Sequence, residues 1–372
     1  MKYQDLYQEL LNLNSDLVYP FSYQHKDYLD FWTELVEKYK ERINLLDEES
    51  ITTLNGAFKK ALQGYNNYTP KKEHNFKDNF EEIYKTLSNV LNKCYANYYE
   101  EAFAELSEFF KKDDLFYLKI LPKMLIKENN LFFRIRPNFT ERDASDGDLF
   151  HVPFNARHKI GSTRYGFPGY PVLYLAYSFS TAWYEMDCPD IKTFSYAKFK
   201  NCQALSLLDL GYPIKENPED WEYYSFLAFY PLIMGCLISV RNPEGPFKPE
   251  YVLPQLMTKI IREYPQKENL IIGQPLTYKG FNGIVYMSTK SPNKNKLQNL
   301  SSRNIALFPQ NTICRSGCDN KYLAPKLEIT DIKNFSDKPD DLTKEQQLGY
   351  ISEEDSFSPT DNFHHIDVPM EK

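Results

Sequence analysis

The sequence lacks the hydrophobic runs and targeting features of membrane and secreted proteins. No window of this 372-residue chain approaches the roughly 18 uninterrupted apolar residues that a membrane span needs. The segment MKYQDLYQEL at the start contains no apolar signal core. The six cysteines are scattered, a usage typical of reduced proteins. We therefore expect a cytoplasmic protein that makes no membrane contact.

Two common kinds of site are also missing from the sequence. The closest cysteine pair, Cys314 and Cys318, has no second Cys/His pair at ligand spacing, so no metal site is expected. No glycine-rich dinucleotide fingerprint follows a strand pattern. This absence argues against a dehydrogenase of the Rossmann type.

Acidic residues are absent from two long stretches, although the chain carries a net charge of −7. Residues 149–184 and 269–318 contain no Asp or Glu but several Lys and Arg, and the first stretch ends at a single carboxylate, Glu185. Residues 331–372 hold 11 Asp/Glu against 4 Lys/Arg, so the rest of the chain is close to neutral. This distribution favours a local pocket for an anionic ligand and does not favour a broad nucleic-acid-binding face.

Apolar periodicity predicts helices in two parts of the chain. Helical spacing runs through 27–46, 48–63 and 77–112, the last as one continuous stripe, and returns in 221–240 and 250–264. These stripes are typical of the core of a helical bundle and carry no polar constellation suited to chemistry.

Strand patterns occupy the remaining middle of the chain, at 131–136, 171–178, 194–210, 280–292 and 304–309. Ser178 or Ser180 can cap a short helix that places Glu185 within its first two turns. Arg134 alternates with large apolar residues, so it needs an anionic partner if buried, or else lies on an edge strand in solvent.

The predicted fold class is α+β. We expect an N-terminal helical domain over 1–125 and a β-rich catalytic domain over 126–330, with a helical insertion at about 212–265. The acidic, apolar-poor segment 331–372 is predicted to be a flexible tail.

Three local matches resemble the RES domain, which is named for an arginine, a glutamate and a serine. LFFRI places the arginine at Arg134, RYGFPGYPVLYLAYSFSTAWYE places the glutamate at Glu185, and GIVYMST followed by NIALFP places the serine at Ser288. The matches cover about 131–310. The family's usual Gly-Arg-Trp-Asn run is replaced by STRYG.

The resemblance implies an ADP-ribosyltransferase-like fold and a toxin of a toxin–antitoxin pair. Such a protein consumes NAD by phosphorolysis, hydrolysis or ADP-ribosyl transfer. Glu185 would stabilise positive charge on the ribose, Arg134 would bind the diphosphate and Ser288 would orient the amide or ribose. Further candidates for substrate binding are Arg164, Tyr165, Tyr174, Arg157, Lys159 and Arg303.

Two other functions stay open at this level. The altered STRYG segment is compatible with a non-catalytic nucleotide-binding module, and the basic stretch 269–318 with an RNA-targeting toxin. Expected partners are NAD as substrate and an antitoxin or other protein. The N-terminal helices could dock a partner, act as a built-in inhibitor or mediate oligomerisation, and the sequence does not choose among these roles.

Overall fold

The computed structural model describes two compact units. Unit 1 contains Met1–Lys123 and Leu208–Glu263, and unit 2 contains Met124–Leu207 and the chain from Gly280 onward. Helices and a 10-stranded sheet together confirm the predicted α+β class. The described residues are 1–12, 15–19, 21–63, 74–137, 146–213, 218–264, 280–290, 299–310, 315–356, 358 and 361–368.

Unit 1 is helical, as the periodicity of its sequence indicated. The prediction of one continuous helix pattern over 77–112 was wrong, because the helix breaks after Tyr95 and Asn97 takes a left-handed φ of 64°. That conformation ends the first helix and lets the second pack back against it. The helices are α1 (Tyr3–Leu11), α2 (Tyr28–Asn44), α3 (Glu48–Gln63), α4 (Phe76–Tyr95), α5 (Tyr99–Lys119), α8 (Asp220–Leu237) and α9 (Val252–Glu263). The segment YNNYTPKKEHN (65–75), whose composition also predicts a turn or linker between the helices, lies almost entirely outside the described residues.

Helix α8 is the buried centre of unit 1, and it contains a proline in its middle. Pro231 has no N–H to offer to the carbonyl of Leu227, one turn earlier. The hydroxyl of Tyr39 donates to that carbonyl at 2.8 Å, and the indole N–H of Trp32 donates to the carbonyl of Pro231 at 3.0 Å. Helix α2 thus satisfies backbone groups of α8. The helical region predicted around 212–265 therefore belongs to the core of unit 1.

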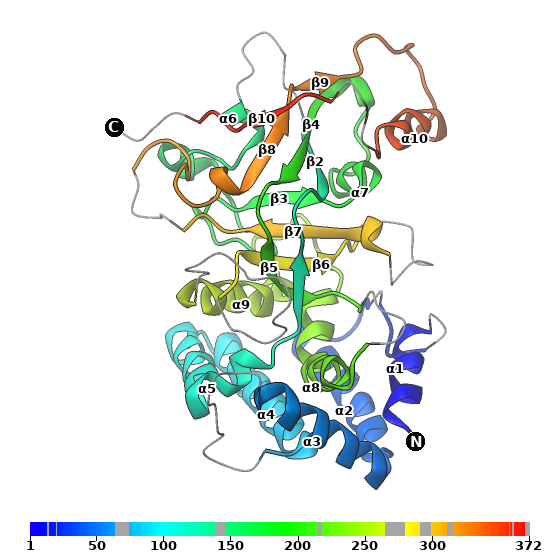
Figure 1. Cartoon of the computed structure of the whole chain (residues 1–372), viewed down its shortest axis with the longest axis vertical. Helices are drawn as coiled ribbons and strands as arrows, with labels where there is room; N and C mark the ends of the chain where they lie inside the picture. Colours follow the sequence, from blue (N-terminus) through cyan, green and yellow to red (C-terminus); the bar gives the residue numbers. More distant parts are fainter. Residues whose placement is uncertain are drawn as a thin grey trace. The chain divides into compact units, whose positions relative to one another are not determined.

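Unit 2 is organised by the sheet, whose strand order is β1-β5-β6-β7-β3-β2-β4-β8-β10, with β9 paired to β4. Strands β6, β7 and β3 form an antiparallel set, and β2, β4, β8 and β10 form another. In Figure 1 the first set lies across the direction of β2, β4 and β8. The strands are β1 (Lys123–Ile126), β2 (Leu131–Pro137), β3 (Leu173–Ala176), β4 (Phe194–Asn201), β5 (Leu205–Leu210), β6 (Gly283–Met287), β7 (Arg303–Leu307), β8 (Leu327–Thr330), β9 (Lys333–Asn334) and β10 (Phe363–His365).

One face of this sheet is covered by α7 (Phe179–Glu185), while α6 (Asp146–Leu149) lies beside β2. Phe133 and Ile135 of β2 pack with Phe179 and Trp183 of α7 in a buried cluster. Gly283 allows the close approach of β6 to β7, because a Cβ there would lie 2.1 Å from the carbonyl oxygen of Ala306. The helix that carries Glu185 thus packs against a sheet in which β6 and β7 lie close together.

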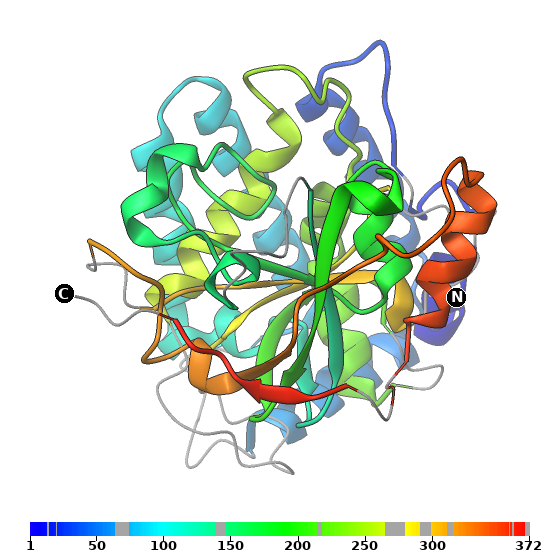
Figure 2. The same cartoon turned by 90° about the horizontal axis from the view of Figure 1, so that it is seen from above.

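The described part of 331–372 is folded, which corrects the expectation of a flexible tail. It forms β9, α10 (Lys344–Glu353) and β10, and β10 pairs with β8 at the sheet edge. Figure 2 shows β10 alongside β8, and α10 packs against α7. The acidic residues that suggested a solvated tail include Asp361, which is buried beside two lysines of unit 2. Counting charges along the sequence could not identify these partners.

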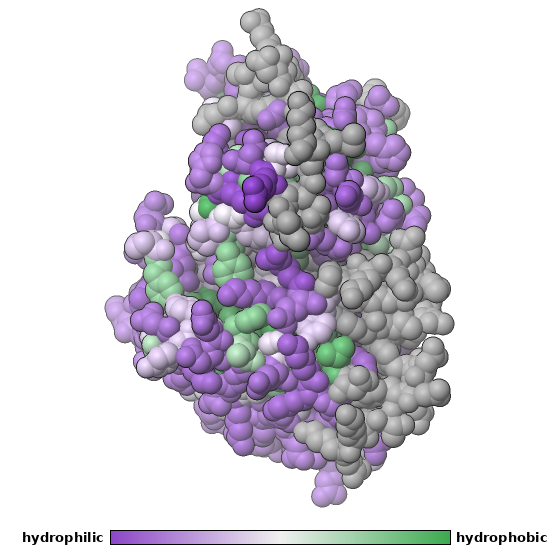
Figure 3. Space-filling model, turned by 90° about the vertical axis from the view of Figure 1, so that its left-hand side faces the viewer, coloured by the Kyte–Doolittle hydropathy of each residue, from purple (hydrophilic) through white to green (hydrophobic). Residues whose placement is uncertain are grey.

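Within the described parts of the chain, no helix is long and apolar enough to cross a bilayer. On the face that Figure 3 presents, hydrophilic residues predominate and apolar residues form small patches.

Candidate functional site

Helix α7 positions Glu185, and both ends of this helix are capped. Of the two predicted cap residues, Ser178 and Ser180, the N-cap is Ser178, whose hydroxyl accepts a hydrogen bond from the N–H of Thr181 at 3.1 Å. Glu185 is the last helical residue, and its backbone carbonyl accepts a hydrogen bond from the ammonium of Lys290 at 2.9 Å. Lys290 also binds Asp187, which has a left-handed φ of 62°. These contacts hold the end of α7 that carries the carboxylate.

The side chain of Glu185 lies over β7. Its Oε1 accepts a hydrogen bond from the amide of Asn304 at 2.8 Å. Asn304 pairs with Ala176 on β3 and with Tyr286 on β6, so it lies in the middle of three strands. Among the residues that the structure describes, Oε2 of Glu185 accepts no hydrogen bond and can therefore interact with a ligand.

The STRYG segment forms a tight turn that presents Arg164 and Tyr165. The N–H of Thr163 donates to the carbonyl of Gly166 at 2.9 Å, and the reverse bond measures 3.2 Å. A Cβ at Gly166 would lie 2.4 Å from the hydroxyl oxygen of Thr163, so this closed turn requires glycine. The departure from the family pattern therefore produces a defined structure.

Three tyrosines lie together beside this turn. The hydroxyl of Tyr174 is 2.7 Å from that of Thr163 and accepts the N–H of Tyr165 at 3.3 Å. The rings of Tyr165 and Tyr286 lie 4.5 Å apart. Burial raises the pKa of Tyr286 well above its ordinary value, and the negative charge of Glu185 raises it further. Tyr286 therefore stays neutral, and the three rings provide an aromatic surface close to Glu185.

Arg134, the predicted diphosphate-binding cation, lies on β2. Phe133 and Ile135 pack with α7, so the alternation of β2 places Arg134 on the opposite face of that strand. Its guanidinium donates to the backbone carbonyl of Tyr174 at 3.1 Å, while its buried Nε has no hydrogen-bond partner in the described structure. Burial lowers the pKa of Arg134 to about 10, so it remains charged at neutral pH. No direct contact joins Arg134 to Glu185 among the described residues.

Arg157, like Arg134, lies close enough to His151 for its charge to affect that imidazole. Burial lowers the pKa of His151 to about 4, and the positive charges of Arg134 and Arg157 contribute to this effect. Nε2 of His151 accepts the N–H of Asp319 at 2.8 Å, so His151 is a neutral, structural group. Arg157 itself donates to the carbonyl of Gly169 at 3.2 Å. Two guanidiniums thus lie near one buried, neutral imidazole.

The remaining predicted residues differ in their exposure. Arg164 is buried and donates to the hydroxyl of Thr289 at 3.4 Å. Ser288 is buried, and its hydroxyl accepts the N–H of Lys290 at 3.3 Å. Arg303 is fully buried at the start of β7, next in sequence to Asn304 and therefore on the opposite face of the strand. Lys159 is exposed, at the end of a short 3₁₀ helix.

Sequence reasoning missed Asn304, Thr163 and the contribution of Tyr286. Asn304 stands as a polar residue in the otherwise apolar NIALFP run, and this was the available signal. Tyr286 lies in the strand predicted at 280–292 but was not assigned to the site. Within the described residues, no group of three His, Cys, Asp or Glu side chains is placed to hold a metal ion.

Comparison with known proteins yields one informative relative. The chain is 28% identical over 255 residues to a protein of Bacillus subtilis (strain 168) named "Putative toxin YopC". The match covers 63% of this chain and 52% of that protein, so it spans about half the length of the relative. No family model matches the chain. No solved structure matches it either.

Proposed function

We propose that this protein is a RES-like toxin that cleaves the bond between nicotinamide and ribose in NAD. The observation that carries the proposal is Glu185, a carboxylate held by Asn304 beside three tyrosines, with one oxygen available to a ligand. The similarity to a protein named as a toxin supports the biological class. The resemblance to the RES domain supports NAD as the substrate and an antitoxin as the expected protein partner.

The chemistry requires few groups. Nicotinamide leaves as a neutral molecule from a cationic pyridinium, so no strong general acid is needed. The transition state places positive charge on the ribose, and a nearby carboxylate stabilises that charge. In this proposal Glu185 fills that role, while Tyr165 or Tyr174 stacks against the nicotinamide ring and Ser288 orients the amide or ribose. No metal is called for in this step.

The diphosphate of NAD requires cations. Guanidiniums bind phosphate oxygens through paired hydrogen bonds. Arg134 suits this role because its buried Nε has no hydrogen-bond partner within the described structure. Arg164, from the turn beside the tyrosines, is the second candidate, with Arg157, Arg303 and Lys159 as further cations for the substrate or for inorganic phosphate.

The test is incubation of the purified chain with NAD, with and without inorganic phosphate, followed by identification of products by mass. We expect release of nicotinamide, and the second product identifies the acceptor as phosphate, water or a macromolecule. Glu185→Gln is expected to lower the rate about 10²- to 10³-fold, because it removes the charge that stabilises the ribosyl cation.

Glu128→Gln is the matched control, since Glu128 is an exposed glutamate of unit 2 in the turn between β1 and β2. It should retain full activity. Tight NAD binding without nicotinamide release over hours would replace the enzyme proposal with a nucleotide-binding module. Full activity in Glu185→Gln would remove Glu185 from the mechanism.

A further inference from the structure

The segment after β9 contacts the helix that carries Glu185. Helix α10 packs against α7, and Ile351 joins Phe179 and Trp183 in the buried cluster. The side chain of Gln347 on α10 accepts the N–H of Ile191, just beyond α7, at 3.2 Å. This segment is therefore part of the surroundings of α7.

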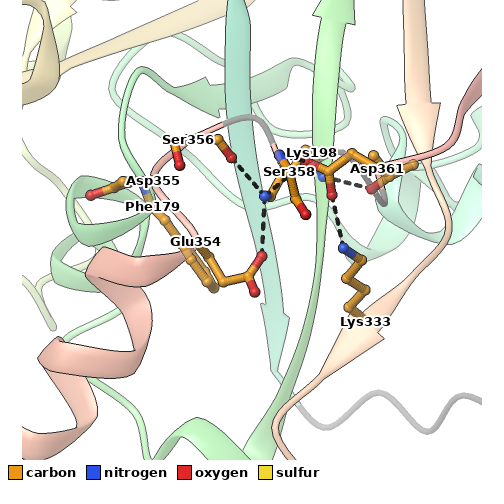
Figure 4. Close-up of polar contacts among 9 residues, drawn as sticks. Phe179, Lys198, Lys333, Glu354, Asp355, Ser356, Ser358 and Asp361 are labelled. Atoms are coloured by element: carbon orange, nitrogen blue, oxygen red, sulfur yellow. Dashed lines mark hydrogen bonds and ion pairs between the residues drawn. The ribbon is translucent and has the colours of Figure 1, made fainter.

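Lys198 of β4 anchors the chain that follows α10. The side chain of Lys198 is 1% exposed, and its ammonium lies 3.1 Å from Glu354 and 3.0 Å from Asp361. It also donates to the carbonyl of Ser356 at 2.9 Å. Asp361 in turn binds Lys333 at 2.8 Å, as Figure 4 shows. The anchored positions lie on both sides of Asp355 in the sequence.

Asp355 makes a direct contact with α7. Its Oδ1 accepts the N–H of Phe179, the first residue of that helix (Figure 4 shows the two side by side). The first N–H groups of a helix have no partner within the helix, so a carboxylate there both satisfies one of them and complements the helix dipole. Burial raises the pKa of Asp355, against the opposing effect of the N–H groups of Phe179 and Ser180.

Helix α7 depends on such contacts because it is short. It contains 7 residues, and helices of this length do not persist on their own in water. Its N-terminal end is bound by Ser178 and Asp355, and the carbonyl at its C-terminal end by Lys290. A shift of α7 would move Glu185 relative to Asn304.

We propose that Asp355 is a positioning residue, which holds α7 so that Glu185 contacts Asn304, and that the segment 344–356 therefore supports the active site. The catalytic side of this inference rests on the function proposed above. The structural side stands on the contact between Asp355 and Phe179 and is tested separately.

The structural test is hydrogen exchange of the α7 amides in the full chain. Asp355→Ala is expected to speed hydrogen exchange of residues 180–186 on the order of tenfold, because the closed helix loses a capping bond and its local opening becomes easier. Asp355→Asn retains a side-chain oxygen and should restore most of the protection. Asp340→Ala removes an ion pair between the same region and Lys192 that does not touch α7, so it should leave the exchange unchanged. Unchanged exchange in Asp355→Ala overturns the inference.

The catalytic test is steady-state turnover of NAD by the same proteins. Asp355→Ala is expected to lower kcat roughly tenfold or more with little change in KM, because misplacing Glu185 affects the transition state more than substrate binding. Asp355→Asn should recover most of the rate. Faster α7 exchange with unchanged kcat would refute the positioning role.

These outcomes separate the inference from the proposed function. If the unaltered protein releases no nicotinamide, the proposed function fails and hydrogen exchange still decides the role of Asp355. If Asp355→Ala does not fold, Asp355→Ser replaces it, because serine is too short to make the same bond and remains polar. Unaltered exchange in that variant would likewise contradict the inference.

Discussion

Arg134 is a buried cation with an unusual set of neighbours. It donates to one backbone carbonyl, and no carboxylate among the described residues contacts it. Burying a charge without an opposite charge opposes folding, so selection for stability alone would not favour an arginine at this position. An anionic ligand would supply the missing interaction.

We therefore expect Arg134→Met to leave the free energy of unfolding unchanged or to raise it, while it weakens NAD binding. Urea denaturation measures the first quantity and calorimetric titration with NAD the second. A loss of about 3–5 kcal/mol in stability, the cost of breaking a buried ion pair, would show that the arginine has an anionic partner in the ligand-free protein.

The sequence predicted the local setting of individual residues better than their contacts. A serine cap at Ser178 or Ser180 and a short helix that carries Glu185 follow from the order of residues, because both are local properties. The bond between Glu185 and Asn304 joins positions 119 residues apart. No pattern along the chain encodes which amide will face a given carboxylate, so this contact was found only in the structure.

At the scale of elements, β2 to β7 lie in or close to the predicted strand ranges, whereas β1, β8, β9, β10 and the break between α4 and α5 were not predicted. The apolar stripe continues across Asn97, so periodicity alone indicated one helix there. The acidic composition of 331–372 was misleading for a related reason. Two of its carboxylates, Glu354 and Asp361, pair with Lys198 of β4, which lies outside this segment, and Asp361 also pairs with Lys333 of β9 within it.

Lys198 provides the test at this scale. Lys198→Ala leaves Asp361 and Glu354 without their shared ammonium, and removing one partner of a buried ion pair costs about 3–5 kcal/mol. We expect a loss of this size in chemical denaturation, together with faster exchange in α10. An effect below about 1 kcal/mol would mean that the cluster behaves like a surface ion pair.

At the scale of the whole molecule, charge is distributed unevenly. Residues 331–372 carry 11 Asp/Glu against 4 Lys/Arg, so the net charge of this segment is −7, the same as the net charge of the whole chain. Part of this negative charge forms ion pairs with lysines inside unit 2. Burial opposes ionisation of Asp361, but Lys333, the N–H of Ser358 and Lys198 together hold its pKa below the ordinary value.

The pH dependence of stability follows from this shift. Because the folded protein favours ionised Asp361, its contribution is present above the ordinary pKa of 3.8 and is lost as the pH falls through the lower native pKa. We expect the unfolding midpoint to fall more steeply below about pH 4 in the unaltered protein than in Asp361→Asn. Thermal denaturation across pH 2.5–6 measures this difference, and identical acid slopes would contradict it.

The fold class and the strands around the site were predictable, since alternation and turn residues mark them. The grouping of α8 and α9 with the N-terminal helices was not, because the fit of α8 against α2 depends on side chains such as Tyr39 and Trp32 meeting the carbonyls around Pro231.

The bond from Asp355 to Phe179 has a consequence during synthesis. A ribosome translating this message completes α7 well before it reaches residue 355, so the growing chain carries Glu185 on a helix that is not yet secured. If the proposed NAD turnover depends on that bond, the nascent polypeptide consumes NAD more slowly than the completed chain does. Full activity would begin only after the later segment has emerged and docked, which leaves an interval for a neutralising partner to bind.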